Sequence, residues 1–489
     1  MRTKLAKVMA FMITAVVALG TAAAHATEAP HEIIVKYRDG SMRTRPAMNS
    51  LYQNAGVRKV RRMRGLNTGV EQLYLSDAIS MDEALDALRK DPNVEYAQPN
   101  YMLYALPIQK TSVDVGAKAG GIPCIPGFDI PGCDPDATLP CLIPGIPFPP
   151  GCEDSGNPGN PGEPGEPGQP APGRPELQDP PAEVNPPVAD PQLAKAYGIS
   201  KVGSPQVWET HKGNKNFVVA VIDTGIDYNH EDLSFNVWRN PNPGPKNDVA
   251  GYDFVHDDGL PFDDNQHGSH CAGTIGAVGG NGIGVSGVAQ RVSIMGLKFL
   301  SGEGSGTTAD AIRAIDYAVE KGAKVLSNSW GGKGDDGNQA LKESIDRAKA
   351  KDVLFIAAAG NDGTNNDGNN PSYPAGFNND NLIAVAATDK DDKLAYFSNY
   401  GKKSTHLAAP GVNVYSTTPG NKYAQLSGTS MACPHVAGAA ALIWSKNPSM
   451  TYKQVKAALL NSVDKLPALS EKTVTGGRLN VFQALRSME

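Results

Sequence analysis

Short apolar runs and two amphipathic segments alternate through residues 31–104. The pattern predicts strands at 33–37, 57–60, 70–75 and 94–96, and helices at 46–55 and directly after residue 80. The sequence Ser80-Met81-Asp82-Glu83 is a capping box, which supports the start of the second helix. Because a β-α-β-β-α-β order is typical of a ferredoxin-like module, we expect residues 27–105 to form one.

The apolar runs of residues 190–489 are continuous rather than alternating. Those at 217–222, 353–357 and 382–385 contain no polar position, as is typical of parallel strands that are covered on both faces. Helical patterns lie between or after them, at 308–321, 338–351, 430–445 and 451–462. This alternation predicts a doubly wound, mostly parallel α/β domain, in which sites form at the carboxyl ends of the strands.

Proline and glycine dominate residues 106–189, where apolar periodicity is lost. Glycine recurs at every third position from Gly156 to Gly168, a run too short for a collagen helix, and an extended linker is the better interpretation. Four cysteines bound two similar stretches of this linker, and two local disulfide loops fit the repeat best. Because four cysteines allow three pairings, the connectivity stays open; they are Cys124, Cys133, Cys141 and Cys152.

Residues 1–26 have the pattern of a signal peptide. Basic residues precede an apolar run at 8–19, and Ala24-His25-Ala26 fits a cleavage site. A membrane anchor is the alternative, but the run is shorter than the roughly 20 apolar residues that a spanning helix needs. We therefore expect a secreted protein, extracellular or periplasmic, with no membrane span in its mature form.

The charge balance argues against a nucleic-acid partner. The chain has 45 Lys and Arg against 51 Asp and Glu, a net charge of −6. A short basic cluster is interpreted as a solvated face of the N-terminal module; it comprises Arg58, Lys59, Arg61, Arg62 and Arg64.

Three polar residues stand where a site is expected. Asp223 ends the first continuous apolar run, His267 opens a segment of small residues, and Ser430 follows Gly428 at the start of an apolar helical segment. Taken singly they are equally a turn aspartate, a packed or capping histidine and a helix N-cap serine. Together they supply a nucleophile, a base and a carboxylate that orients the base.

The surrounding motifs closely resemble those of the subtilisin-like serine peptidases. They read Val-Ile-Asp223-Thr-Gly-Ile-Asp, His267-Gly-Ser-His-Cys-Ala-Gly-Thr and Gly-Thr-Ser430-Met-Ala-Cys-Pro-His-Val-Ala-Gly. The order Asp, His, Ser is the subtilisin order, and Ala432 excludes a G-x-S-x-G elbow. The resemblance covers residues 190–489, and residues 31–104 look like the inhibitory propeptide of the same family.

The resemblance also implies roles for other residues. Asn361 is expected to donate to the oxyanion, together with the backbone N–H of Ser430. Ser372 is expected at the bottom of an open S1 pocket that takes apolar P1 residues. The remaining substrate-binding positions, several of which pair with substrate as an added strand, are Gly304, Ser305, Gly306, Ser329, Trp330, Gly331, Ala358 and Gly360.

A structural calcium ion is the expected cofactor. Asp232 matches the carboxylate of the family's calcium site, and the loop at 279–285 offers the oxygen ligands that calcium prefers. A helix-capping Asp232 beside a glycine-rich surface loop is the alternative. The other expected ligands are Gln192, Asn281, Ile283 and Val285.

These observations predict a secreted serine endopeptidase that is made as a self-processing zymogen, with proteins or peptides as substrates and its own propeptide as inhibitor. A non-catalytic protein that retains the fold and a processing enzyme of narrow specificity are the alternatives. Cys271 and Cys433 are spaced to lie one turn beneath His267 and Ser430. They are interpreted as buried free thiols, although a disulfide between them is possible.

Overall fold

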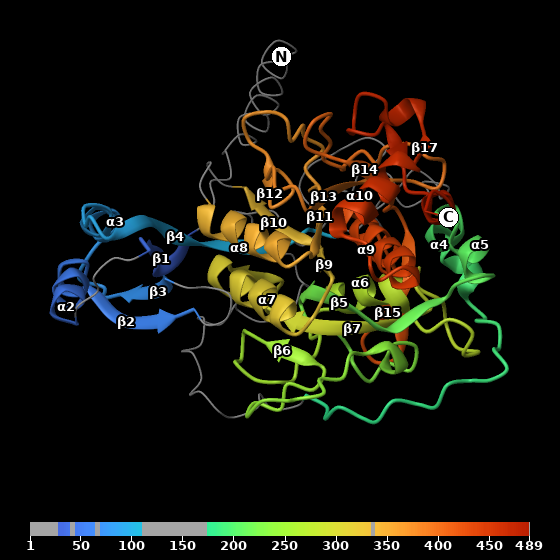
Figure 1. Cartoon of the computed structure of the whole chain (residues 1–489), viewed down its shortest axis with the longest axis horizontal. Coiled ribbons are helices and arrows are strands. Elements are labelled where there is room, and N and C mark those ends of the chain that lie inside the picture. Colours follow the sequence, from blue (N-terminus) through green and yellow to red (C-terminus); the bar gives the residue numbers. More distant parts are fainter. Residues whose placement is uncertain (1–27, 40–44, 64–68, 110–173, 334–337, 489) are drawn as a thin grey trace, which may run out of the picture. The chain divides into compact units, whose positions relative to one another are not determined.

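The computed structural model describes residues 28–39, 45–63, 69–109, 174–333 and 338–488. The expected signal peptide and the four linker cysteines lie outside these residues, so the structure does not bear on either prediction. Figure 1 shows the arrangement of the elements.

The N-terminal module, residues 28–105, has the predicted β-α-β-β-α-β order (blue in Figure 1). Its four antiparallel strands lie in the order β4-β1-β3-β2. The capping box is present, because Ser80 accepts from the Glu83 N–H and Glu83 accepts from the Ser80 N–H. The elements are β1 (Glu28–Tyr37), α2 (Arg45–Asn54), β2 (Val57–Arg62), β3 (Val70–Leu75), α3 (Met81–Arg89) and β4 (Val94–Ala105).

The C-terminal domain, residues 174–488, is built on a nine-stranded sheet in the order β17-β18-β14-β13-β11-β9-β5-β7-β6. Every pair in this sheet is parallel except β17 with β18. Its strands are β5 (Gly213–Asp223), β6 (Gly251–Asp253), β7 (Arg291–Lys298), β9 (Val325–Asn328), β11 (Leu354–Ala358), β13 (Leu382–Thr388), β14 (Leu407–Pro410), β17 (Asp464–Lys465) and β18 (Gly477–Arg478).

Helices cover both faces of this sheet, as the continuous apolar runs predicted. Val219 and Val221 of β5 belong to the same apolar cluster as α6 and α9, whereas Ala220 and Ile222 belong to the cluster with α7 and α8. The helices of the domain are α4 (Tyr197–Lys201), α5 (Ser204–Trp208), α6 (His267–Gly276), α7 (Thr308–Glu320), α8 (Gln339–Ala350), α9 (Thr429–Lys446), α10 (Tyr452–Asn461) and α11 (Val481–Arg486).

Strand β4 of the N-terminal module continues into the C-terminal domain. Its end lies antiparallel between β8 (Ser305–Thr307) and β10 (Trp330–Lys333). Strand β10 in turn pairs with β12 (Ser372–Tyr373), and β15 (Val414–Thr418) forms a separate hairpin with β16 (Lys422–Leu426). The module and the domain therefore share one antiparallel sheet.

Part of the expected linker packs against the C-terminal domain. The Arg174 guanidinium is 2.7 Å from Asp253 and 3.2 Å from Asp258, and it also donates to the Leu260 carbonyl. Val188 forms a parallel bridge with Asn281. Residues 174–189 thus belong to the folded domain, although their composition predicts an extended linker.

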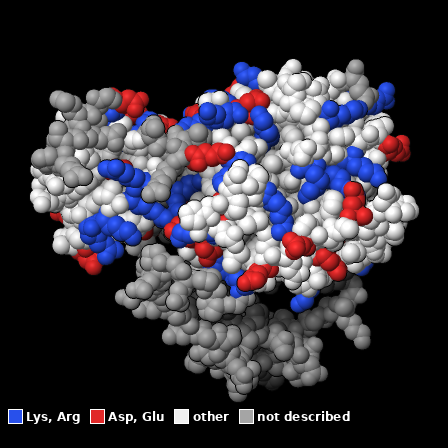
Figure 2. All heavy atoms as spheres, turned by 60° about the horizontal axis from the view of Figure 1, so that its bottom comes forward, with Lys and Arg blue, Asp and Glu red and all other residues white. Residues whose placement is uncertain are grey.

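Within the described part of the chain, no helix combines the length and apolarity needed to cross a bilayer. On the face shown in Figure 2, basic and acidic side chains are intermixed and neither sign forms a continuous field.

Candidate active site

Asp223 and His267 meet at the carboxyl end of β5. The His267 Nδ1 is 2.7 Å from Asp223 Oδ1, and both side chains are almost completely buried. The close approach of α6 to the strand requires a glycine after the histidine, since a Cβ at Gly268 would lie 2.0 Å from the Gly225 carbonyl oxygen. Asp223 also accepts from the Thr224 N–H, which fixes its carboxylate.

The pKa of His267 is determined by two opposing effects. Burial, the largest single effect, lowers the pKa, but the charge and hydrogen bond of Asp223 and the charge of Asp263 together raise it by more, so the net shift is upward from 6.5. With Nδ1 held by Asp223, the proton-accepting position of a neutral ring is Nε2. That atom is buried and has no hydrogen-bond partner among the described residues.

Ser430 is the second residue of α9, as the sequence predicted. Its hydroxyl donates to the Ser329 carbonyl at 3.1 Å, and no bond to His267 is formed in this state. Pro434 cannot donate to the Ser430 carbonyl one turn back. That carbonyl instead accepts from Ser329 Oγ at 3.0 Å and from Cys271 Sγ at 3.4 Å.

Cys271 connects the two halves of the site. Its sulfur and the ligand atoms of Asp223 and His267 all lie within 4.8 Å of one another, and the same sulfur contacts the Ser430 carbonyl. The three residues of the expected triad are therefore gathered at one place, where α6 and α9 begin. No disulfide joins Cys271 to Cys433, and both are free and buried.

Asn361 lies beside the start of α9 and is oriented by Thr429. Its Oδ1 accepts from the Thr429 N–H at 2.9 Å and from the Thr429 hydroxyl at 2.8 Å. Because Oδ1 is held by Thr429, the Nδ2 group points away from Thr429, and it donates to the Pro107 carbonyl at 2.9 Å. The side chain therefore offers an N–H donor to a carbonyl that reaches the site.

The two segments expected to pair with substrate, at residues 304–306 and 329–331, both lie against β4 and the residues that follow it; they are called the substrate edges. Leu103 pairs with Gly306 and Tyr104 with Ser305, and the Gly304 carbonyl accepts from the Ala105 N–H. On the other side, Tyr104 pairs with Gly331 and Ala105 with Trp330, and the Ser329 carbonyl accepts from the Leu106 N–H at 3.4 Å.

The side chain of Trp330 lies in the core and is fully buried. It makes edge contacts with Phe299 at 4.9 Å and Phe355 at 6.5 Å between ring centroids. Only the main chain of Trp330 pairs with the added strand.

The expected S1 residues lie together next to that strand. A Cβ on Gly331 would come 3.2 Å from Ser372 Oγ and 3.7 Å from Leu106 Cδ2, and a Cβ on Gly360 would come 3.1 Å from Ser372 Cβ. Ala358, at the end of β11, is also buried. The side chain of Leu106 therefore lies at this pocket.

The expected calcium ligands lie in one region but do not all face one point. Asp232 accepts from Asn281 Nδ2 and from the Val285 N–H, and Asn281 Oδ1 accepts from the Ile283 N–H. The Gln192 amide oxygen is engaged elsewhere, by Tyr415 and Lys195.

Asp190 is a carboxylate of this region that the sequence did not identify. It accepts from the N–H groups of Gly280 and Asn281. Burial raises the pKa of Asp232 to about 8, and the charge of Asp190 adds to the shift. Asp190 and Asp232 offer the buried carboxylate oxygens that would hold a calcium ion.

The sequence did not identify two buried residues, Asp263 and Lys298, that hold the backbone next to Asp223 and His267. Asp263 is buried and accepts from the Thr224 hydroxyl and from three backbone N–H groups at the start of α6. Lys298 is fully buried and pairs with Asp223 in the register of β5 and β7. Its ammonium donates to the carbonyls of Thr224 and Leu300 and to Asp264. An aspartate just before a helix was the available signal for Asp263.

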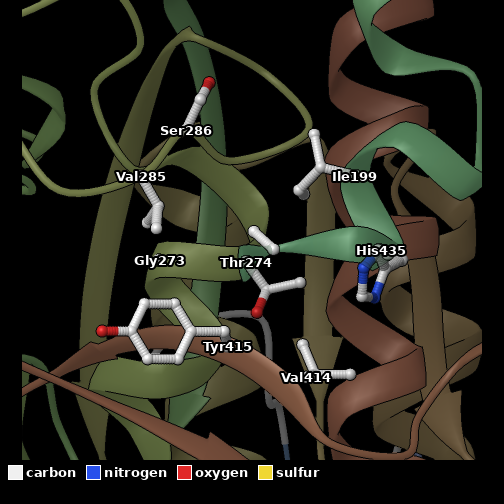
Figure 3. A pocket seen from close by; sticks show the side chains of 10 residues that line it. Ile199, Gly273, Thr274, Val285, Ser286, Val414, Tyr415 and His435 are labelled. Atoms are coloured by element: carbon white, nitrogen blue, oxygen red, sulfur yellow. The ribbon is translucent and has the colours of Figure 1, made fainter. Parts of the chain in front are cut away.

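His435, in the third motif, is not part of this site. It lines a small pocket with Ile199, Thr274 and Tyr415 (Figure 3). Its Nδ1 contacts the Met431 carbonyl at 2.8 Å, and burial lowers its pKa to about 4, so the ring is neutral. A Cβ at Gly198 would lie 2.4 Å from its Nε2, which indicates that this histidine packs the start of the domain onto α9.

The sequence matches two protein families. Residues 214–479 match the subtilase family, and residues 18–100 match the fervidolysin N-terminal prodomain. The second match begins within the segment interpreted as a signal peptide.

Several curated proteases are similar to the chain. Thermitase from Thermoactinomyces vulgaris is 40% identical over 298 residues, which cover 61% of this chain and 98% of thermitase. Subtilisin DY from Bacillus licheniformis is 40% identical over 270 residues, covering 55% and 92%. The thermophilic serine proteinase of Bacillus sp. (strain AK1) is 40% identical over 238 residues, covering 49% of this chain and 54% of that protein.

The matches and the fold agree with the resemblance noted in the motifs. The family match spans more than half of the chain and includes β5, α6 and α9, which carry the three gathered residues. The chain belongs to the subtilase family and is a serine endopeptidase whose N-terminal module is a prodomain.

Proposed function

We propose that Ser430, His267 and Asp223 hydrolyse peptide bonds through an acyl-enzyme. Ser430 attacks the scissile carbonyl while His267 takes its proton and passes it to the leaving amine. Asp223 fixes the ring tautomer and stabilises the cation. The observation that supports this best is the 2.7 Å contact of Asp223 with His267 Nδ1, which leaves Nε2 unpartnered near the start of α9.

Asn361 and the Ser430 N–H stabilise the oxyanion in this proposal. The Asn361 amide is oriented by Thr429 and already donates to a carbonyl oxygen. Donors that are held in place before the charge develops lower the barrier most. Water then hydrolyses the acyl-enzyme and releases the acid product.

The N-terminal module acts as an intramolecular inhibitor, and the enzyme is exported and processes itself. Pairing of β4 with both substrate edges supports the inhibition, and the pattern of residues 1–26 supports export. A structural calcium ion at Asp190 and Asp232 is part of the same proposal, with Asn281, Ile283 and Val285 in the surrounding loop and Gln192 at its edge.

Casein hydrolysis and labelling by a sulfonyl fluoride test the mechanism. Ser430→Ala should fold, fail to take up the label and show negligible turnover. Ser445→Ala, at the other end of α9, is a matched control that should retain activity. Substantial proteolysis by purified Ser430→Ala would contradict the mechanism, and total inactivity of wild-type enzyme freed of its N-terminal module, on casein and on a peptide library, would favour a non-catalytic protein.

A peptide library separates broad from narrow specificity. The position of Leu106 beside Ser372 and Gly331 favours apolar P1 residues in an open pocket. Cleavage of many sequences with an apolar P1 residue is the expected result, and restriction to one sequence would favour a processing enzyme.

A further inference from the structure

The chain that follows β4 runs through the candidate active site without a break. Before Ser430 it is held by the Ala105 N–H on the Gly304 carbonyl and the Leu106 N–H on the Ser329 carbonyl. Beyond Ser430 the Gln109 N–H donates to the Ser427 carbonyl at 2.8 Å. Residues 103–109 are therefore bound on both sides of the nucleophile.

Leu106 occupies the position of a P1 side chain. It is 8% exposed, and its Cδ2 lies near Gly331, next to Ser372. It is also the last residue whose N–H pairs with the substrate edge, since the following residue is a proline. The positions of its side chain and of its N–H both predict cleavage of the peptide bond after Leu106.

The carbonyl that reaches the oxyanion donor belongs to the next residue. Asn361 Nδ2 donates to the Pro107 oxygen at 2.9 Å. Acyl transfer needs one residue to place its side chain in the pocket and its carbonyl at the oxyanion donors. Here these two requirements are met by Leu106 and Pro107 separately, so the bound segment is out of register by one residue.

Neither bond at this point is set up for attack. Cleavage after Leu106 would release the nitrogen of Pro107. On that nitrogen the ring Cδ takes the place of the amide hydrogen and crowds the approach of His267. After Pro107 the pocket would have to accept proline in place of Leu106. The Ser430 hydroxyl meanwhile donates to the Ser329 carbonyl rather than to His267.

We propose that Pro107 makes residues 103–109 a substrate-like strand that the enzyme binds but does not cut. The N-terminal module then remains a covalently attached inhibitor until a peptide bond outside this segment is hydrolysed. Pro107 prevents cleavage within this segment, and the side chain of Leu106 blocks the S1 pocket. The proposal rests on the proposed role of Ser430 as nucleophile.

Mass spectrometry of the purified full-length chain over time tests this proposal. Wild type should yield no fragment that ends at residue 106 or 107. Pro107→Ala should yield a fragment ending at Leu106, at a rate independent of protein concentration, because the leaving nitrogen regains its N–H and the register can shift. Pro92→Ala, in an exposed turn of the same module, should behave as wild type, and Pro107→Ala with Ser430→Ala should remain uncut.

A second measurement does not depend on how the variant folds. A synthetic peptide of residues 101–109 should inhibit the active enzyme and stay intact, whereas the same peptide with alanine at 107 should be cut after Leu106 at least about tenfold faster. Wild-type cleavage after 106 or 107 at the rate of the alanine forms overturns the proposal. So does an uncut alanine peptide in an enzyme that hydrolyses casein, whereas loss of all hydrolysis overturns the proposed function itself.

Discussion

Ser329 and Ser430 exchange two hydrogen bonds. The Ser430 hydroxyl donates to the Ser329 carbonyl at 3.1 Å, and the Ser329 hydroxyl donates to the Ser430 carbonyl at 3.0 Å. Ser329 also accepts from the N–H of Leu106 in the bound strand. The Ser329 carbonyl thus accepts from both the nucleophile and the bound strand, and this carbonyl, not the strand, competes with His267 for the proton of the Ser430 hydroxyl.

The pH dependence of activity should report the contact between Asp223 and His267. Because Asp223 holds the pKa of His267 above 6.5, wild-type kcat should fall on acidification with an apparent pKa above that value, as the base becomes protonated. In Asp223→Asn burial still lowers the His267 pKa but the carboxylate is gone, so the acid limb should move to lower pH and kcat should fall by about 10⁴.

Rate profiles from pH 4 to pH 9 on a soluble peptide measure both effects. Asp391→Asn, an exposed carboxylate, is the control and should keep the wild-type profile. An unchanged acid limb in Asp223→Asn would mean that the carboxylate does not set the pKa of the catalytic base.

Calcium removal should destabilise the enzyme through Asp190 and Asp232. Burial raises the pKa of Asp232, and repulsion by the Asp190 carboxylate adds to the shift, so the charged forms of both groups are less stable without a bound cation. Addition of a chelator should lower the Tm by about 5 °C or more, as expected for loss of a ligand present well above its Kd. Asp232→Asn should have a Tm that no longer responds to the chelator or to added calcium, and an unresponsive wild type would exclude the site.

The sequence predicted the fold and singled out Asp223, His267 and Ser430 as candidates because both leave local signals. A continuous apolar run ending in Asp223 indicates a buried parallel strand with a site at its end, and the structure has that strand as β5. Residues 174–189 leave no such signal, since they are held by the ion pairs of Arg174 and by backbone bonds rather than by apolar periodicity. The direction of the Trp330 side chain was equally out of reach, because strand pairing in β10 is what turns it into the core.

Cys271 and Cys433 should be unreactive in the folded enzyme. Burial raises the pKa of the Cys271 thiol well above 9, and it raises that of Cys433 to about 11, so little thiolate exists at neutral pH. Thiol titration of the denatured, unreduced chain should find two reactive groups, since the four cysteines of residues 110–173 are predicted to be paired.

A mercurial that does reach Cys271 should inhibit by separating α6 from α9, because this sulfur contacts the Ser430 carbonyl. Cys271→Ala should therefore retain activity and lose much of its sensitivity to the mercurial. Finding no titratable thiol in the denatured chain would show that the two cysteines are bonded in solution.

The N-terminal module should inhibit the enzyme through two helix N-termini as well as through the bound strand. Gln98 Oε1 accepts from the Ala340 N–H at the start of α8, and Asn100 Oδ1 accepts from the Ala309 N–H at the start of α7. Both side chains are buried where the module meets the domain. Loss of one such hydrogen bond costs about 1 kcal/mol, so Gln98→Ala and Asn100→Ala should each raise the inhibition constant of the added module about fivefold.

The inhibition constant of a module comprising residues 28–107 against the active enzyme measures this effect, with Asp82→Ala on the exposed side of α3 as the control. The two N–H groups lie on separate helices, whose starts are linked by Asn338, so a departure of the double variant from the product of the two single changes measures their coupling. If both single variants bind like wild type, the contacts of β4 with β8 and β10 alone account for inhibition, and the helix N-termini contribute nothing to it.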